Sequence, residues 1–103
     1  MNVLFRLNAG RKNGLGHLLR NIYLSDELKS INFNTQFLIK TDKTIFINNF
    51  LSKKKINLNV QYINEETTQE DELVLIKKIS SLKNIKIVII DHYDSSIEYL
   101  KSI

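Results

Sequence analysis

All 3 glycines of this 103-residue chain lie within a seven-residue stretch, and a histidine directly follows the last of them. The stretch reads AGRKNGLGHLLR and contains Gly10, Gly14, Gly16 and His17. Glycine is used where the backbone must take a positive φ angle or come close to a bulky group. At the start of a helix, such a turn presents backbone N–H groups to which an anion or a polar sugar could bind. The alternative is a tight strand-to-helix turn that needs glycine for steric reasons alone.

Two common phosphate-binding motifs do not match this turn. It is not a Walker motif, because only three residues separate Gly10 from Gly14 and no lysine follows Gly16. It is not the dinucleotide-binding fingerprint either, because Leu19 stands where the third small residue should be. The glycine turn therefore predicts a binding site of another kind or a purely structural turn.

His17 and Arg20 are the polar residues that follow the glycines. The positive end of a helix dipole disfavours an imidazolium ion, so a neutral His17 could accept a proton at pH 7 and serve as a base. The alternative is an ordinary surface or packing histidine. Arg20, one turn later, is placed either to share a site with His17 or to pair with an acid such as Asp91.

A second polar group is predicted from the first and last strands. Arg6 interrupts the apolar run 3–7, and a buried guanidinium needs a carboxylate or several carbonyl groups around it. Asp91 is one candidate partner, although it could instead cap the helix that follows. His92 and Tyr93 would then contact a sugar or a base, or simply pack. No metal site is predicted, because the chain has only 2 histidines and no carboxylate cluster accompanies them.

The hydrophobic pattern predicts the elements that position these residues. Strands are expected at residues 3–7, 35–39, 59–63 and 85–90, and helices at 16–31, around 45–51 and at 67–83, with a last helix beginning near Ser95 or Ser96. Thr41 or Asp42 is expected to cap the second helix, and Thr67 with Glu70 fits a capping box for the third. The run at 85–90 is almost entirely apolar, as expected for a central strand that is covered on both faces.

This alternation predicts an α/β fold with a doubly wound, parallel, Rossmann-like sheet in the strand order 3-2-1-4. Residues 1–103 are expected to form one domain. Ligands of such sheets bind beyond the carboxyl ends of the strands, at the point where the strand order reverses. That point lies between the first and fourth strands, so loops 8–17 and 91–94 are predicted to meet in one crevice.

The composition limits the kinds of partner that the chain is expected to bind. The net charge is +4, but the lysines are scattered, and Lys53, Lys54 and Lys55 follow a predicted helix whose dipole they complement. Nucleic-acid binding is therefore not expected. The chain has no cysteine, no leader-like segment and no apolar run long enough for a membrane, so a cytoplasmic protein without a membrane partner is expected. A domain of this size has a small core and gains stability from a second domain or chain.

These motifs resemble a known family of sugar-nucleotide hydrolases. The segment Phe5-Arg6-Leu7-Asn8, the segment GLGHLLR at 14–20 and Asp91-His92-Tyr93 are similar to the N-terminal part of the pseudaminic-acid pathway hydrolases. That family includes proteins described as spore-coat polysaccharide proteins and has a two-domain, glycosyltransferase B-like architecture. Its members release UDP from a UDP-linked 2,4-diacetamido-2,4,6-trideoxyhexose. The resemblance runs from residue 2 to about residue 100.

The resemblance implies a role for each matching residue. His17 would be the catalytic histidine that activates or orients water at the anomeric carbon. The residues expected to bind the substrate are Arg6, Asn8, Gly14, Gly16, Arg20, Asp91, His92 and Tyr93. No cofactor is implied, and the expected small-molecule partner is the UDP-sugar.

The sequence also departs from the family pattern. Asn8 stands where the family usually has an aspartate, Ser95 and Ser96 replace a Leu-Asp pair, and residues 1–103 contain no counterpart of the C-terminal UDP-binding domain. We therefore expect an incomplete N-terminal domain that has little activity alone and acts with a complementary C-terminal chain or self-associates. The alternatives are half of a glycosyltransferase, a non-catalytic module that binds a nucleotide, an anion or a protein, and a degenerate remnant.

Overall fold

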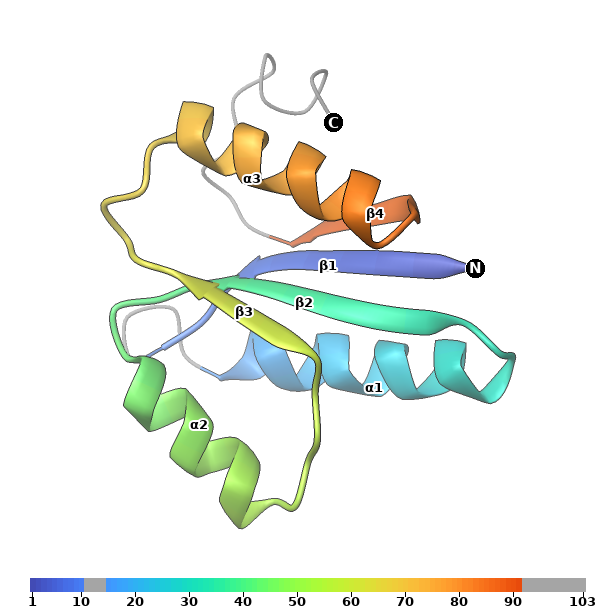
Figure 1. Ribbon diagram of the computed structural model, residues 1–103. Helices are drawn as coiled ribbons and strands as arrows, with labels where there is room; N and C mark the ends of the chain where they lie inside the picture. The colour runs from blue at the N-terminus through green and yellow to red at the C-terminus, as the bar shows by residue number, and fades with distance from the viewer. Residues whose placement is uncertain (11–14, 92–103) are drawn as a thin grey trace.

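The computed structural model describes residues 1–10 and 15–91 of the chain. Strands and helices alternate along it (Figure 1). The elements are β1 (Asn2–Asn8), α1 (Gly16–Ser30), β2 (Asn34–Lys40), α2 (Thr44–Lys53), β3 (Val60–Ile63), α3 (Gln69–Leu82) and β4 (Ile85–Asp91).

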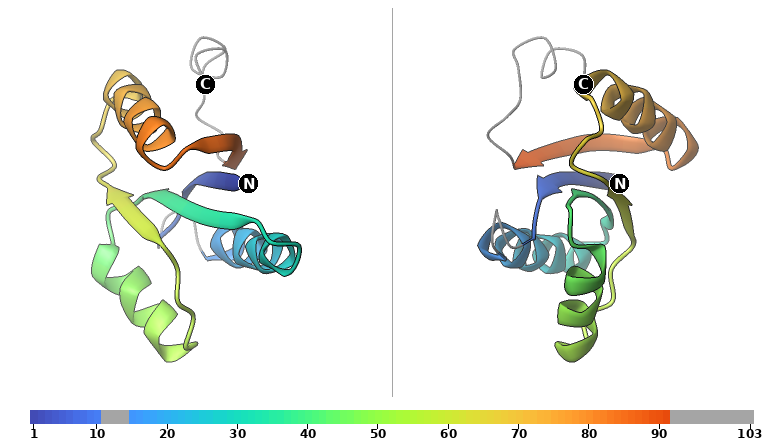
Figure 2. Two further views of the ribbon diagram at one scale, coloured as in Figure 1. Left: turned by 45° about the vertical axis from the view of Figure 1, so that its right-hand side comes forward. Right: turned by 90° about the vertical axis from the view of Figure 1, so that its left-hand side faces the viewer.

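The four strands form one parallel sheet in the order β3-β2-β1-β4. Right-handed crossovers from β1 to β2 to β3 place α1 and α2 on one face, and the return to β4 places α3 on the other (Figures 1 and 2). The predicted doubly wound, Rossmann-like fold and its strand order are therefore confirmed. The strand order reverses between β1 and β4, as the sequence predicted.

The alternation of side chains along β1 builds a core on each face of the sheet. Val3, Phe5 and Leu7 are buried in the core shared with α1 and α2, whereas Leu4 is buried in the core under α3. Phe5 is paired in register with Phe37 of β2, and their rings stack with centroids 4.8 Å apart. Such an aromatic pair contributes about 0.5–1.5 kcal/mol beyond the area that it buries.

The structure corrects the predicted start of α3. Its N-cap is Thr68, whose Oγ1 accepts the backbone N–H of Asp71 at 3.1 Å, so the capping box predicted from Thr67 was wrong. The Thr67 hydroxyl instead donates to Asn64 Oδ1 at 3.1 Å, within a turn that precedes the helix. Because Asn64 holds Thr67 in that turn, the next threonine becomes the cap.

The predicted cap of α2 was also wrong. Lys43 is the N-cap of α2 and forms no side-chain cap, while Thr41 Oγ1 accepts the Lys43 backbone N–H at 3.0 Å. The threonine therefore closes the turn before the helix and does not cap the helix itself.

The central position expected for residues 85–90 differs from the observed one. Within the part of the chain that the structure describes, β4 lies at one end of the sheet and Ile87 is 40% exposed, whereas β1 and β2 are central. The apolar pattern indicated coverage on both faces, but strand order and not hydrophobicity sets the position in the sheet. The helix predicted near Ser95 or Ser96 lies outside the described residues.

Candidate functional site

The switch point is formed by the carboxyl ends of β1 and β4. β1 ends at Asn8, and the backbone of Leu7 is in register with that of Asp91 at the end of β4. The glycine turn leaves β1 here and enters α1 at Gly16. In sheets of this type, ligands bind at this edge. Gly14, His92 and Tyr93, which the sequence assigned to this site, lie outside the described residues, as does the side chain of Asp91.

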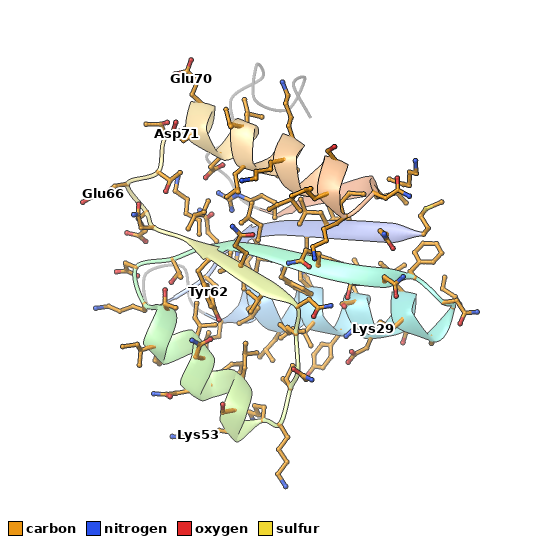
Figure 3. The ribbon with its side chains drawn as sticks, viewed as in Figure 1. Lys29, Lys53, Tyr62, Glu66, Glu70 and Asp71 are labelled. Carbon is orange, nitrogen blue, oxygen red and sulfur yellow. The ribbon has the colours of Figure 1, made fainter. Side chains whose placement is uncertain are left out.

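The start of α1 differs from the start of α3. The N-cap of α1 is Leu15, which offers no side-chain cap, and the first turn of α1 contains no acidic residue. In contrast, α3 has the Thr68 cap, with Glu70 and Asp71 in its first turn (Figure 3). The side chains of its own first turn therefore neutralise the positive end of α3 but not that of α1.

The two glycines that the structure describes have different roles. Gly10 has a φ angle of +134°, and a Cβ atom built on it would lie 2.9 Å from Oγ1 of the buried Thr41. The structure therefore explains Gly10 on steric grounds, because a residue without a side chain is needed where the chain packs against the loop after β2. A Cβ built on Gly16 would meet no heavy atom within 4 Å. The steric explanation therefore does not account for Gly16, which faces open space at the start of α1.

His17 and Arg20 contact each other on α1. Arg20 Nη2 lies 2.8 Å from His17 Nδ1. A guanidinium can only donate a hydrogen bond, so Nδ1 must be the acceptor and the proton of a neutral imidazole must be on Nε2. The side chain of Asn21, which is buried, donates to the His17 carbonyl oxygen at 2.7 Å. Arg20 therefore contacts His17, and the ring nitrogen that faces Arg20 accepts its hydrogen bond.

Arg6 forms a buried ion pair with Glu72 of α3. Arg6 Nη2 lies 2.6 Å from Glu72 Oε1, and both side chains are only 1% exposed. Lys40 Nζ from β2 lies 3.0 Å from the same oxygen, so one carboxylate links two strands and a helix. Arg6 Nη1 also donates to Asn8 Oδ1 at 2.8 Å. The sequence correctly indicated that Arg6 needs a carboxylate, but it suggested Asp91 and missed Glu72.

The predicted site residues thus form two contact groups. Arg6 and Asn8 belong with Glu72 on the face covered by α3, whereas His17 and Arg20 belong to α1 on the opposite face. Both groups lie toward the carboxyl edge, where β1 ends and α1 begins. The sequence placed all four residues in one crevice, and the structure assigns them to two sides of one edge.

Two hollows lie away from this edge. One of about 240 Å³ is at the amino ends of the strands and is lined by residues that include Asn2, Asn34 and Lys83. The other, of about 460 Å³, lies between α3 and β4 and has Ile76, Lys77 and other residues in its walls. Neither hollow is lined by a residue that the sequence assigned to the site.

Residues 1–10 and 15–91 contain no group of three or more histidine, aspartate or glutamate side chains that could hold a metal ion. No helix among them is long and apolar enough to cross a membrane. Comparisons with protein-family models, curated proteins and solved structures find no match. The fold and the two contact groups define an α/β, Rossmann-like domain with a polar switch-point edge.

Proposed function

We propose that this chain provides the sugar-side domain of a hydrolase that cleaves a UDP-linked diacetamido-trideoxyhexose to free sugar and UDP. The proposal rests on the resemblance in the segments around Arg6, His17 and Asp91. The observation that carries it is the position of His17 in the first turn of α1, the helix that follows β1. In a doubly wound sheet this is where a substrate is expected.

The chemistry needs few protein groups. The oxygen of water bonds to the anomeric carbon while the bond from that carbon to the diphosphate breaks, and its electron pair leaves on the phosphate oxygen. The water then loses a proton to the solvent. Because a nucleoside diphosphate is already a good leaving group, the reaction does not need the two carboxylates of ordinary glycosidases. His17 would orient the water or the departing oxygen.

A UDP-binding domain is part of this proposal. In the family that the chain resembles, the C-terminal domain binds the nucleotide, and transition-state stabilisation depends on holding the leaving group. Residues 1–103 would then act with such a domain, which supplies the nucleotide contacts, and would have little activity without it.

A second candidate is a non-catalytic module that binds an anion or a nucleotide. Asn8 favours it, because an amide cannot act as a base where the family usually has a carboxylate. The uncapped start of α1 would suit either function.

UDP release from the family's UDP-sugar tests the proposal. The chain is assayed alone and together with the C-terminal domain of a full-length family member. We expect release only in the mixture, and we expect His17→Ala to lower the rate by about 10²–10³-fold, the usual cost of losing one group that stabilises a departing oxygen. Tyr23→Ala is the matched control, since it removes an exposed ring from the same helix.

The outcomes separate the two candidates. Release that survives His17→Ala at the rate of the Tyr23→Ala control would contradict the proposed role of His17. If folded chain and C-terminal domain release no UDP, but the chain binds UDP and keeps that affinity in His17→Ala, the binding module replaces the hydrolase.

A further inference from the structure

The hollow between α3 and β4, of about 460 Å³, is open on the face of the sheet that α3 covers. Its walls include four apolar side chains, which are Leu73 and Ile76 of α3 and Ile85 and Val88 of β4. Ile76 is buried, but the other three are only partly buried at the border of the core under α3. Apolar surface of this kind is removed from water, and the fold is stabilised, when another apolar element covers it.

Two lysines give the same hollow a positive rim. Lys77 of α3 and Lys86 of β4 line it, and both residues are exposed. None of the acidic residues that the structure describes lies in its walls. An element that fits the hollow therefore combines an apolar face with an acidic residue, because opposite charges around a contact favour the correct pairing.

The handedness of the connections directs the chain after β4 to this face. The connections from β1 to β2 to β3 run in one direction along the sheet, with α1 and α2 on one face. The return from β3 to β4 runs in the opposite direction, with α3 on the other face (Figure 2). β4 is the last described strand at its end of the sheet. A right-handed connection that continues outward from β4 runs on the face of α3 again, over the hollow.

The segment 95–103 has the composition that the hollow requires. Ile97, Leu100 and Ile103 recur at every third residue, so they share one face of a helix, and Glu98 supplies an acidic group. The sequence predicts that a helix begins at the start of this segment. These residues lie outside the part of the chain that the structure describes.

We propose that the segment 95–103 docks as a helix in the hollow between α3 and β4. Ile97, Leu100 and Ile103 would cover the apolar walls, and Glu98 would lie toward the lysines of the rim. The hollow is then a part of the core that the chain itself completes, not a ligand site. Docking would also hold residues 92–94 from both sides, between β4 and the docked helix. The inference does not depend on the reaction that the chain performs.

A nitroxide spin label tests the docking in the full ¹⁵N-labelled chain. The native chain has no cysteine, so a label attaches only to the cysteine of Ser80→Cys, in the wall of the hollow. Ser52→Cys is the matched control, because Ser52 is an exposed residue of α2 on the opposite face of the sheet. We expect the label in Ser80→Cys to broaden the amide signals of residues 97–103 and the label in Ser52→Cys to leave them sharp.

A mixed sample distinguishes the chain's own segment from that of a second copy. Spin-labelled Ser80→Cys without ¹⁵N is mixed with the unlabelled ¹⁵N native chain, and we expect no broadening of residues 97–103. Broadening in this mixture would assign the hollow to a second copy and overturn the proposal. Sharp signals of residues 97–103 in folded, labelled Ser80→Cys, or equal broadening from both label positions, would overturn it as well.

Two neighbouring substitutions test the apolar face of the segment. Leu100→Asp places a charge on that face, whereas Lys101→Asp places the same side chain one residue away. In spin-labelled Ser80→Cys, we expect Leu100→Asp to abolish the broadening and to lower the midpoint of urea unfolding, and Lys101→Asp to do neither. The amide signals of β1 and β2 show that each variant is folded. Equal effects of the two substitutions would contradict the docking.

Discussion

The buried carboxylate of Glu72 compensates two cations, Arg6 at 2.6 Å and Lys40 at 3.0 Å. Moving a charge from water into the protein interior costs free energy, and removing one partner of a buried ion pair leaves the other charge there without compensation. The sequence showed that Arg6 needed a carboxylate. It also contained the signal that identifies Glu72, because residues 72, 76 and 79 share one face of α3 and Ile76 and Ile79 are apolar core residues. Glu72 is thus an acidic residue on a buried helix face, and that position marks it as the partner of a buried cation.

Glu72→Gln should therefore destabilise the fold. We expect the free energy of unfolding to fall by about 3–5 kcal/mol, the usual cost of breaking a buried pair. Urea unfolding of Glu72→Gln and of Glu66→Gln, which removes an exposed carboxylate before α3, measures the difference (Figure 3). If the two variants lose the same stability, the buried pair does not have the role assigned to it.

The glycines give a second prediction at the scale of single residues. Gly10→Ala should lower the free energy of unfolding by about 1–3 kcal/mol, because of the positive φ angle and the 2.9 Å approach to Thr41 Oγ1. Gly16→Ala should leave stability unchanged or raise it by up to about 1 kcal/mol, since alanine is favoured over glycine in a helix. Thermal unfolding of both variants compares them directly. A larger loss for Gly16→Ala would contradict the steric difference between the two positions.

At the scale of elements, every strand and helix in the described ranges was predicted to within a few residues. The predicted N-terminal caps of α2 and α3 were wrong. The apolar periodicity of α1 and α3 and the apolar runs of β1 and β2 depend on burial, which a single sequence records well. The cap of a helix depends on which nearby hydroxyl group is free of hydrogen bonds within the preceding turn. Thr67 and Thr41 were both engaged by turns, so the predicted starts of α3 and α2 were shifted.

The contact between β3 and α2 makes stability depend on alkaline pH. Tyr62 lies between these elements and donates to Asn48 Oδ1 at 2.7 Å (Figure 3), and burial raises its pKa above the ordinary value of 10.0. The unfolded chain therefore loses this proton at a lower pH than the folded protein. The contribution is fully present below pH 10.0 and is lost as the pH rises through the raised pKa.

Tyr62→Phe should accordingly reduce the decline of stability in alkaline solution. Urea unfolding at pH 8 and pH 11 gives that decline for each protein. We expect a smaller decline in Tyr62→Phe than in the native chain and no such change in Tyr23→Phe, whose ring is exposed. Equal declines in all three would mean that Tyr62 does not titrate differently in the two states.

At the scale of the whole molecule, the strand order and the helix layers followed from the alternation of elements and the handedness of crossovers. The same reasoning located the switch-point edge. The alternation of elements did not show how the polar residues at the switch-point edge divide between the two faces of the sheet. That division depends on whether a residue lies within β1 or in the helix that follows it. Arg6, which also binds Asn8, consequently contacts Glu72 of α3, while His17 and Arg20 lie on α1.

The most direct test of this account is a map of where the UDP-sugar binds. Amide chemical-shift changes in the ¹⁵N-labelled chain, titrated with the family's UDP-sugar, locate the ligand without any variant. We expect the largest changes at Asn8, Gly10 and His17, at the carboxyl edge. Changes concentrated around Asn2 and Asn34, at the hollow on the amino edge, would contradict the assignment of the site.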